Sequence, residues 1–408
     1  MFLSANVSQL EPDGSLVVDL TDERGPVLRF GPLAEGMPWA RLEGEYWVPT
    51  DHDYGVLLVN DAHERQRHLP VHRYLASVPA DDLATLNRIR HAQATMLQLT
   101  ARWPEARDLL RANPLLLWMV AERYVVEPKL RHRVPGLLLK PQREMLEWVL
   151  QTPVQPAQVR FLSKLVLTGS DAHTMALLRR FVADAEMVER LRHWRRVPSA
   201  MLGLVLEAPV VAELGWLRQE AAEAANTYDA GRVAYQYQRL LRDTVRMLGI
   251  LNAADRGPGI DLRRYRSAQS VKALHERLIG TARRLGWGNL LASEVSPTQV
   301  FPDPPIPSGG SFEAITSVVE LVKEAERMKH CVITRAPEVM SGACALYRAN
   351  VAGERATLEI SVGRNGEPLS IQEFRLACNE EPSEAAWRAA QQWLKDGREA
   401  WARRNAGR

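Results

Sequence analysis

The segment Phe301–Gly310 constrains the fold of this chain most strongly, because it holds four prolines in six positions and ends in two glycines. Proline fixes φ and favours a stiff, extended backbone, so neither a helix nor a central strand is expected to run through this segment. We therefore predict a Pro-rich linker over residues 301–310 that precedes a separate C-terminal module. The length of 408 residues allows two or three domains of about 150 residues each.

The beginning of the chain is acidic and rich in β-forming residues. Its first sixty residues carry ten acidic and three basic side chains. Ser15–Leu20, Pro26–Phe30 and Tyr54–Val59 are rich in β-branched and aromatic residues, which favour strands. We predict a small acidic β-rich unit over residues 1–78.

Residues 79–300 show the apolar periodicity of helices. Asp81 or Asp82 is placed to cap a helix that runs to Arg102. Prolines and glycines interrupt the pattern at short intervals without a fixed repeat. We therefore predict an ordinary helical domain and not a solenoid of repeats.

Residues 311–408 predict a compact module made of a helix, a three-stranded meander and a second helix. The first helix is expected to begin at Ser311 and end near Lys329, and the last to begin near Pro382. The three strands are expected at Ala343–Asn350, Arg355–Val362 and Leu369–Phe374. Together with the helical middle, this predicts an α+β protein of several domains that is mostly α-helical.

A basic segment in the helical region is typical of a nucleic-acid contact. Residues 128–200 hold thirteen Lys or Arg and six Asp or Glu. Arginine binds phosphate through two hydrogen bonds and stacks on bases. The candidate nucleic-acid-binding residues are Arg190, Arg192, Arg195 and Arg196. A solvated basic surface without a partner is the competing interpretation.

Several classes of protein are disfavoured by the sequence. The longest unbroken apolar run, Leu115–Ala121, has seven residues, whereas a membrane helix needs about 20. The first residues lack the features of a secretory signal, and an odd number of cysteines fits a reducing cytoplasm. The Walker A, GxGxxG and GxSxG motifs are missing. We expect a cytoplasmic protein without a membrane partner or a cofactor.

Two sets of side chains invite a metal interpretation, and neither has convincing spacing. The sets are Cys331, Cys344 and Cys378 with His330, and His52, His63, His68 and His72. The cysteines do not form a CxxC pair, and adjacent side chains rarely converge on one ion. Pro70 interrupts the helical spacing of the second set. No metal site is therefore predicted.

Cys331 is the candidate nucleophile of the C-terminal module. Lys329 and His330 lie next to it in the sequence, and nearby cations stabilise a thiolate and lower its pKa. His330 or Glu359 is the candidate base. Candidate substrate-binding residues are Arg355, Thr357, Gln372 and Asn379. Such a set fits acyl or glycosyl transfer, whereas the competing interpretation is a buried structural cysteine beside a solvated strand face.

The C-terminal module also carries an ordered set of motifs. These are Met328-Lys-His-Cys-Val332, Glu354-Arg-Ala-Thr-Leu-Glu-Ile360, Gln372-Glu-Phe-Arg375, Asn379 and a final helix with tryptophans. In this order they resemble the PcfJ-like family, whose members are encoded on plasmids, phages and other mobile elements and sometimes on chromosomes. The sequence departs from that pattern at Arg335, where the family usually has an aromatic residue, and at Leu376, where it tends to have glycine.

The resemblance covers roughly residues 270–395 and implies a mobile-element setting without an assigned reaction. It also implies that six of the candidate residues belong to one site: His330, Cys331, Thr357, Glu359, Gln372 and Asn379. Two functions follow as alternatives, a cysteine-dependent enzyme and a non-catalytic accessory protein of a mobile element. The expected partners of the second are a nucleic acid or proteins of the element. A scaffold for protein contacts is a third, blander interpretation.

Overall fold

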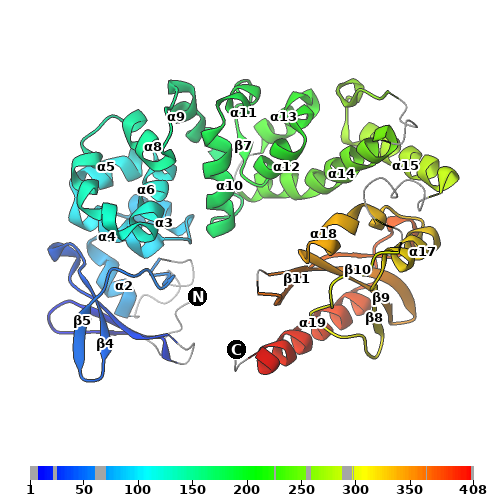
Figure 1. Cartoon of the computed structure of the whole chain (residues 1–408). Coiled ribbons are helices and arrows are strands. Elements are labelled where there is room, and N and C mark those ends of the chain that lie inside the picture. The colour runs from blue at the N-terminus through cyan, green and yellow to red at the C-terminus, as the bar shows by residue number, and fades with distance from the viewer. Residues whose placement is uncertain are drawn as a thin grey trace. The chain divides into compact units, whose positions relative to one another are not determined.

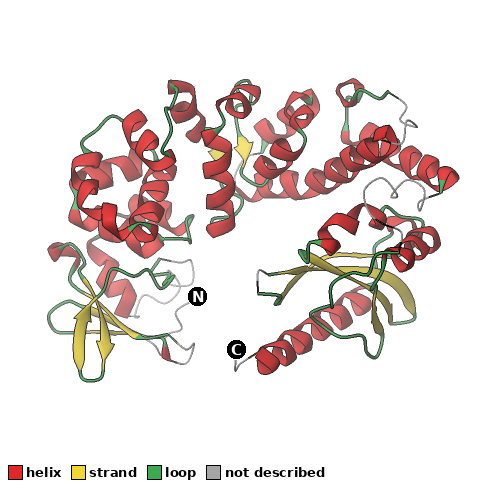
Figure 2. Cartoon of the chain, in the orientation of Figure 1, coloured by secondary structure: helices red, strands yellow, loops and turns green. Residues whose placement is uncertain are grey.

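The computed structural model describes residues 8–21, 25–59, 70–224, 227–253, 259–286, 296, 298–363 and 365–405. The protein is an α+β protein in which helices dominate, as predicted (Figure 2). It forms two compact units, Met1–Gln238 and Arg239–Arg408. This division differs from the predicted boundary at 301–310, because the end of one long helix and the helix after it pack with the C-terminal unit.

The N-terminal unit starts with a five-stranded antiparallel sheet in the order β1-β2-β3-β4-β5. The strands are β1 (Ser8–Leu10), β2 (Leu16–Asp19), β3 (Val27–Phe30), β4 (Trp39–Glu43) and β5 (Tyr46–Pro49). Strands were predicted at Ser15–Leu20 and Pro26–Phe30, and both are confirmed. Tyr54–Val59 forms no strand. Instead, the Val59 N–H donates to Gln93 Oε1 and Gln93 Nε2 donates to the Val59 carbonyl, each at 2.8 Å.

Short helices make up the rest of the N-terminal unit (Figure 1). They are α2 (Pro70–Tyr74), α3 (Ala80–Asn87), α4 (Gln93–Arg102), α5 (Pro104–Ala112), α6 (Pro114–Val126), α7 (Val134–Leu138), α8 (Gln142–Leu150), α9 (Pro156–Leu162), α10 (Ala172–Ala183), α11 (Ala185–Arg190), α12 (Met201–Glu207) and α13 (Gly215–Glu223). A parallel pair, β6 (Leu165–Val166) and β7 (Val197–Pro198), lies among them. In the part of the chain that the structure describes, no helix has the length and apolar character needed to cross a membrane.

The helix predicted to run from Asp81 or Asp82 to Arg102 is divided into α3 and α4. Helix α3 ends at Asn87, and Ala92, which adopts a left-handed conformation with φ of 56°, is the N-cap of α4. The backbone amides of Arg90 and His91 donate to Ser170 at 3.0 and 2.8 Å, so they take no part in a continuous helix. Asp82 caps nothing, because it is buried in a two-bond ion pair with Arg111.

The C-terminal unit begins within α14 (Thr227–Ala253), at Arg239, and its last helix is α19. Its other elements are α15 (Ala268–Leu285), β8 (Phe312–Ala314), α17 (Val318–Met328), the 3₁₀ helix η8 (Val332–Arg335), α18 (Ala336–Met340), β9 (Cys344–Val351), β10 (Glu354–Val362), β11 (Pro368–Arg375), the 3₁₀ helix η9 (Ala377–Asn379) and α19 (Glu384–Asn405). The sheet is antiparallel in the order β11-β10-β9-β8. In Figure 1, α19 lies on one face of this sheet and α17 and α18 lie on the other.

The three strands predicted in this module are confirmed, but the helix predicted from Ser311 is wrong at its start. Phe312–Ala314 form a fourth strand that pairs with β9, because Phe312 and Ala314 fill the apolar core. The helix starts later, where Ser317 Oγ accepts a hydrogen bond from the Glu320 amide at 3.3 Å. This side-chain cap is the usual serine signal at a helix N-terminus.

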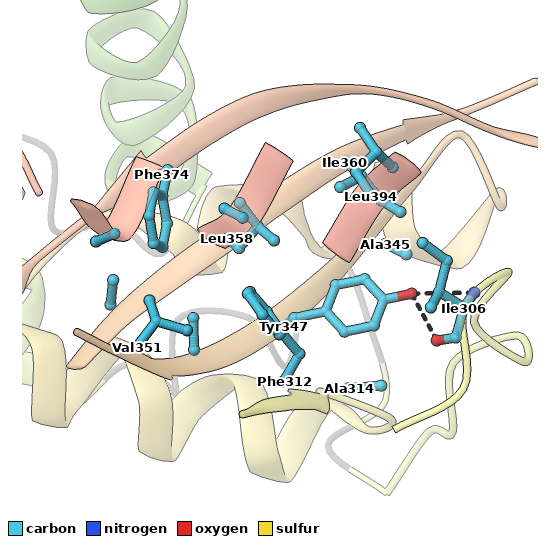
Figure 3. Packing of buried hydrophobic residues seen from close by; sticks show 14 residues of the cluster. Ile306, Phe312, Ala314, Ala345, Tyr347, Val351, Leu358, Ile360, Phe374 and Leu394 are labelled. Carbon is cyan, nitrogen blue, oxygen red and sulfur yellow. Dashed lines mark hydrogen bonds between the residues drawn. The ribbon is translucent and has the colours of Figure 1, made fainter. Parts of the chain in front are cut away.

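The apolar face of the sheet packs against α19 and against the Pro-rich segment (Figure 3). Ile306 is buried in this core, and its backbone N–H and C=O both bond to the Tyr347 hydroxyl, at 3.3 and 2.9 Å. Gly397 of α19 lies so close to Ile306 that an added Cβ would clash with it. The segment expected to be a stiff linker is therefore packed into the C-terminal unit around Ile306.

Candidate functional site

The opposite face of the same sheet carries polar and charged side chains. Along β10, Arg355, Thr357 and Glu359 alternate with residues of the apolar core, so they share the other face. On β11, Glu373 lies opposite Glu359 and Arg375 lies opposite Thr357. Helix α17, η8 and the second half of α14 add further charged groups to this face. The result is a buried polar site within the C-terminal unit.

A chain of hydrogen bonds fixes the ring of His330. The Thr357 hydroxyl lies 2.7 Å from Glu324 Oε1 and 3.0 Å from His330 Nε2. A carboxylate only accepts, so Thr357 donates to Glu324 and accepts from a protonated Nε2. This assigns the tautomer in which Nδ1 is unprotonated, and Nδ1 is buried without a hydrogen-bond partner among the described residues. Burial lowers the pKa of His330 to about 4, so the ring is neutral at pH 7.

Glu324 is the terminal acceptor of these hydrogen bonds and also pairs with Arg355, one of the candidate substrate-binding residues. The Glu324 side chain is 1% exposed and accepts from Arg355, with Arg348 Nε 3.4 Å away. Two guanidinium groups thus balance one buried carboxylate. Arg355 is therefore held by Glu324 and does not line the site at His330.

Cys331 is a buried thiol that is held in its protonated form. It is 8% exposed, and its Sγ lies 3.8 Å from Asp243 Oδ2 as a hydrogen-bond donor. Burial raises the pKa of the Cys331 thiol well above its usual value, and the carboxylates of Asp243 and Glu373 raise it further. The predicted lowering of this pKa is wrong, because the Lys329 side chain is exposed and His330 is neutral.

Buried ion pairs connect α14 to η8 and the sheet. Arg335 is 7% exposed and lies 3.2 Å from Asp243 and 3.1 Å from Glu359. Arg239 lies 2.7 Å from Glu373 and 4.0 Å from Glu359. Burial opposes the charge of Arg335, but the carboxylates of Asp243 and Glu359 outweigh it and raise the pKa of Arg335. Burial raises the pKa of Glu373, although Arg239 partly offsets this.

A small cavity of about 20 Å³ lies among these groups. Its polar lining comes from His330, Cys331, Thr357, Glu359, Glu373, Arg375 and Asn379. Such a volume holds one group the size of a water molecule. Asn379 is exposed, so the cavity reaches the surface beside η9. Cys378 and Asn379 there have φ of 59° and 63°, a conformation that is uncommon for residues other than glycine and that often occurs at functional sites.

The structure brings most of the predicted site residues together and leaves others outside. His330, Cys331, Thr357, Glu359 and Asn379 line the cavity. Gln372 is exposed and bonds to Ser361 and Ser370 at 3.1 and 2.7 Å, away from the cavity lining. The residues of this polar face that sequence reasoning missed are Arg239, Asp243, Glu324, Arg335, Glu373 and Arg375. Two of them carried a signal: Glu324 lies at helical spacing from the buried Leu321 and Met328, and Arg335 departs from the PcfJ-like pattern.

Neither metal set forms a centre in the described part of the chain. No group of three or more His, Cys, Asp or Glu side chains there is arranged to hold a metal ion. Cys331 and Cys344 are buried free thiols, and Cys378 is exposed. His63 and His68 lie outside the described residues.

The arginine run of the N-terminal unit is largely paired with its own chain. Arg190 contacts Glu186 at 2.7 Å and Glu213 at 3.5 Å, Arg192 pairs with Glu189, and Arg196 donates to the Ala224 carbonyl. Trp194 is 2% exposed and its Nε1 donates to the Ala212 carbonyl, so its ring is not free to stack on a base. Arg195 is exposed. The run therefore offers less free positive charge than its sequence indicates.

Comparisons with known proteins identify no relative of this chain. No family model matches it, and neither a curated protein nor a solved structure does. What the protein does is therefore inferred from the geometry and charge of the site.

Proposed function

We propose that this chain is a PcfJ-like protein of a mobile element that acts by recognition, with the cavity at His330 as its ligand site. The carrying observation is the buried His330 ring, which lines the cavity while its Nδ1 has no hydrogen-bond partner among the described residues. A buried acceptor left unsatisfied costs about 1–3 kcal/mol. A ligand group that donates a hydrogen bond there recovers this free energy, so the site favours binding.

The state of the thiol also favours recognition over catalysis. A cysteine nucleophile reacts as its thiolate, which nearby cations stabilise. Around Cys331, burial and the carboxylates of Asp243 and Glu373 act in the opposite direction. The thiol therefore serves as a hydrogen-bond donor that joins the start of η8 to Asp243 of α14.

A cysteine-dependent enzyme is the second candidate, and one contact favours it. Asp243 Oδ2 is the acceptor of the Cys331 S–H group at 3.8 Å, so a carboxylate is in place to take the thiol proton. In that case Cys331 is the nucleophile, and His330 or Glu359 acts on the substrate. Asp243 already pairs with Arg335, and burial holds the Cys331 thiol in its protonated form, which together place the enzyme second.

The mobile-element part of the proposal is supported by the ordered motifs alone. Three motifs of the PcfJ-like pattern contribute to the lining of one cavity: His330 and Cys331 come from the first, Thr357 and Glu359 from the second, and Asn379 from the third. Nucleic acid remains a proposed partner of the N-terminal unit, with Arg192 and Arg195 as exposed members of its arginine run. The paired state of Arg190 and Arg192 supports a weaker contact than the sequence indicates.

The experiment that separates the two candidates is alkylation of the folded full-length chain, followed by mass spectrometry as a function of pH. Cys378 is an exposed control and Cys344 a buried one, so each sample contains both references. For recognition, we expect Cys331 to react as slowly as Cys344 and at least about tenfold more slowly than Cys378. Fast labelling of Cys331 with an apparent pKa below about 8.5 would overturn this function in favour of the enzyme.

A further inference from the structure

We infer that the exposed surface of α15 and of the 3₁₀ helix before it, η7 (Leu262–Arg264), binds the phosphate backbone of a nucleic acid. This surface belongs to the C-terminal unit and does not line the cavity at His330. The inference therefore goes beyond the proposed function, because it concerns neither the cavity nor the arginine run of the N-terminal unit.

The first support is an excess of free positive charge. Residues 259–286 hold seven basic and two acidic side chains. Arg263 pairs with Asp261 at 2.8 Å. The other six basic side chains are exposed and have no ion pair among the described residues: Arg264, Arg266, Lys272, Arg277, Arg283 and Arg284. In the arginine run, by contrast, Arg190 and Arg192 are both paired with glutamates.

The second support is the placement of these charges along one side of a helix. The buried side of α15 includes Leu274 and Leu278 and packs into the unit, so Lys272, Arg283 and Arg284 lie on the opposite side. Lys272 and Arg284 are about 18 Å apart along the helix axis. Duplex DNA carries one negative charge per about 1.7 Å of its axis, so this side of α15 spans several phosphates.

The third support is the lack of exposed apolar side chains, which other anionic partners require. Every residue of α15 is described, and Ala273 is the only apolar one that is exposed. A helix that lies on a membrane inserts large apolar side chains, and a protein interface buries an apolar core. Five of the six free cations are arginines, which bind phosphate through two hydrogen bonds. Charge without apolar surface therefore favours the phosphate backbone of a nucleic acid.

The test measures the binding of a fluorescently labelled DNA duplex of about 20 base pairs to the full-length chain by anisotropy. We expect the logarithm of the association constant to fall with the logarithm of the NaCl concentration, with a slope between about −4 and −6, because each neutralised phosphate releases counterions. An RNA duplex of the same length identifies the source of the phosphates, and tighter binding of either duplex supports the inference.

A triple variant tests the surface of α15 directly. It combines Lys272→Gln, Arg283→Gln and Arg284→Gln, which remove three charges at exposed positions. We expect binding at about 100 mM NaCl to weaken at least tenfold, and the slope to become shallower by about 2–3. Because exposed side chains contribute little to stability, the variant is expected to keep the Tm of wild type.

Two further variants separate this surface from net charge and from unfolding. Arg388→Gln, Lys395→Gln and Arg398→Gln together remove the same charge from exposed positions of α19, and we expect the affinity to change less than about twofold. Glu276→Lys replaces the only acidic residue of α15 with a cation. It is expected to tighten binding at least about threefold and to steepen the slope by about 1, a gain that unfolding cannot produce.

The inference is overturned if no duplex binds at about 50 mM NaCl, or if the α15 and α19 triple variants weaken binding equally. An unchanged affinity of the α15 variant, with binding lost in Arg192→Gln combined with Arg195→Gln, would assign the contact to the N-terminal unit instead. Tighter binding to phosphatidylserine vesicles or to polyglutamate than to either duplex would overturn it in favour of a membrane or of an acidic protein.

The alkylation experiment separates this failure from that of the proposed function. Slow labelling of Cys331 without duplex binding overturns the nucleic-acid surface alone. Fast labelling of Cys331 overturns recognition at the cavity, whereas binding of the duplex to α15 does not depend on that result.

Discussion

The two faces of the C-terminal sheet are built from the same strands and have opposite physical character. On the α19 face, Leu358, Ile360 and Phe374 are at most 1% exposed. The buried Tyr347 hydroxyl accepts a hydrogen bond from the Ile306 N–H and donates one to the Ile306 carbonyl. On the other face, charged groups are buried and the acceptors of His330 and Glu359 lack hydrogen bonds. Apolar packing stabilises a fold, whereas incompletely satisfied buried charge does not. The contrast teaches that one face holds the unit together, whereas the other carries the unsatisfied polar groups on which the proposed ligand site rests.

The largest expected effect comes from the apolar face. Phe374→Ala removes a ring that is 1% exposed and packs edge-on against Trp387 at 5.4 Å between centroids. We expect a loss of about 3–5 kcal/mol in the free energy of unfolding, measured with urea, from lost burial and the cavity left behind. Leu369→Ala on the same strand is the control, because Leu369 is 42% exposed. A loss below about 1 kcal/mol for Phe374→Ala would contradict the role of this face as the core.

The second effect comes from the polar face, where further substitutions are expected to recover the lost free energy of unfolding. Arg335→Met removes the ion pair of buried Asp243 and leaves buried Glu359 with the more distant Arg239, 4.0 Å away, so we expect a loss of about 3 kcal/mol. Adding Asp243→Asn and Glu359→Gln is expected to restore most of that loss, since the uncompensated charges disappear. A thermodynamic cycle over these variants measures the coupling. Losses that simply add up would show that the three groups act independently.

The sequence predicted the apolar face and the strands well, because alternation along one strand is local information. The spacing of Arg355, Thr357 and Glu359 placed these residues on one face without any knowledge of their partners. The predicted start of the preceding helix at Ser311 was wrong, because pairing of Phe312 with β9 is a contact between distant residues. Tertiary pairing of this kind overrides local helix signals.

The polar face was only half predictable for the same reason. Asp243 belongs to α14 and Cys331 follows α17, so nothing in the local sequence connects the carboxylate with the thiol. The pKa direction of Cys331 was therefore predicted from its sequence neighbours, although burial and Asp243 determine it. Arg335 was noticed as a departure from the PcfJ-like pattern. In the structure its guanidinium joins Asp243 to Glu359, a role that an aromatic residue lacks.

The third effect is a pH dependence of the free energy of unfolding, which arises on the polar face through His330. The pKa of His330 is about 4 in the folded protein, below the value of about 6.5 expected for an unfolded chain. Between these two pKa values the unfolded chain binds more protons than the folded protein. The contribution of the neutral His330 ring to the free energy of unfolding is therefore fully present above about pH 6.5 and falls as the pH decreases. We expect wild type to lose about 2 kcal/mol more than His330→Gln between pH 7 and pH 5, measured by urea unfolding. His275, whose pKa is also lowered, and Glu373, whose pKa is raised, titrate in both proteins and cancel in this difference. Parallel pH profiles would show that His330 is not buried as a neutral ring.

The smallest effect marks where the polar face ends. Gln372 and Thr357 are both polar residues of the predicted site, but water replaces the contacts of exposed Gln372 with Ser361 and Ser370 when that side chain is removed. We expect Gln372→Ala to change the free energy of unfolding by less than about 0.5 kcal/mol. Thr357→Val should cost about 1–3 kcal/mol, because Glu324 and His330 then lose a buried partner. Equal losses for the two variants would extend the buried site along β11 to Gln372.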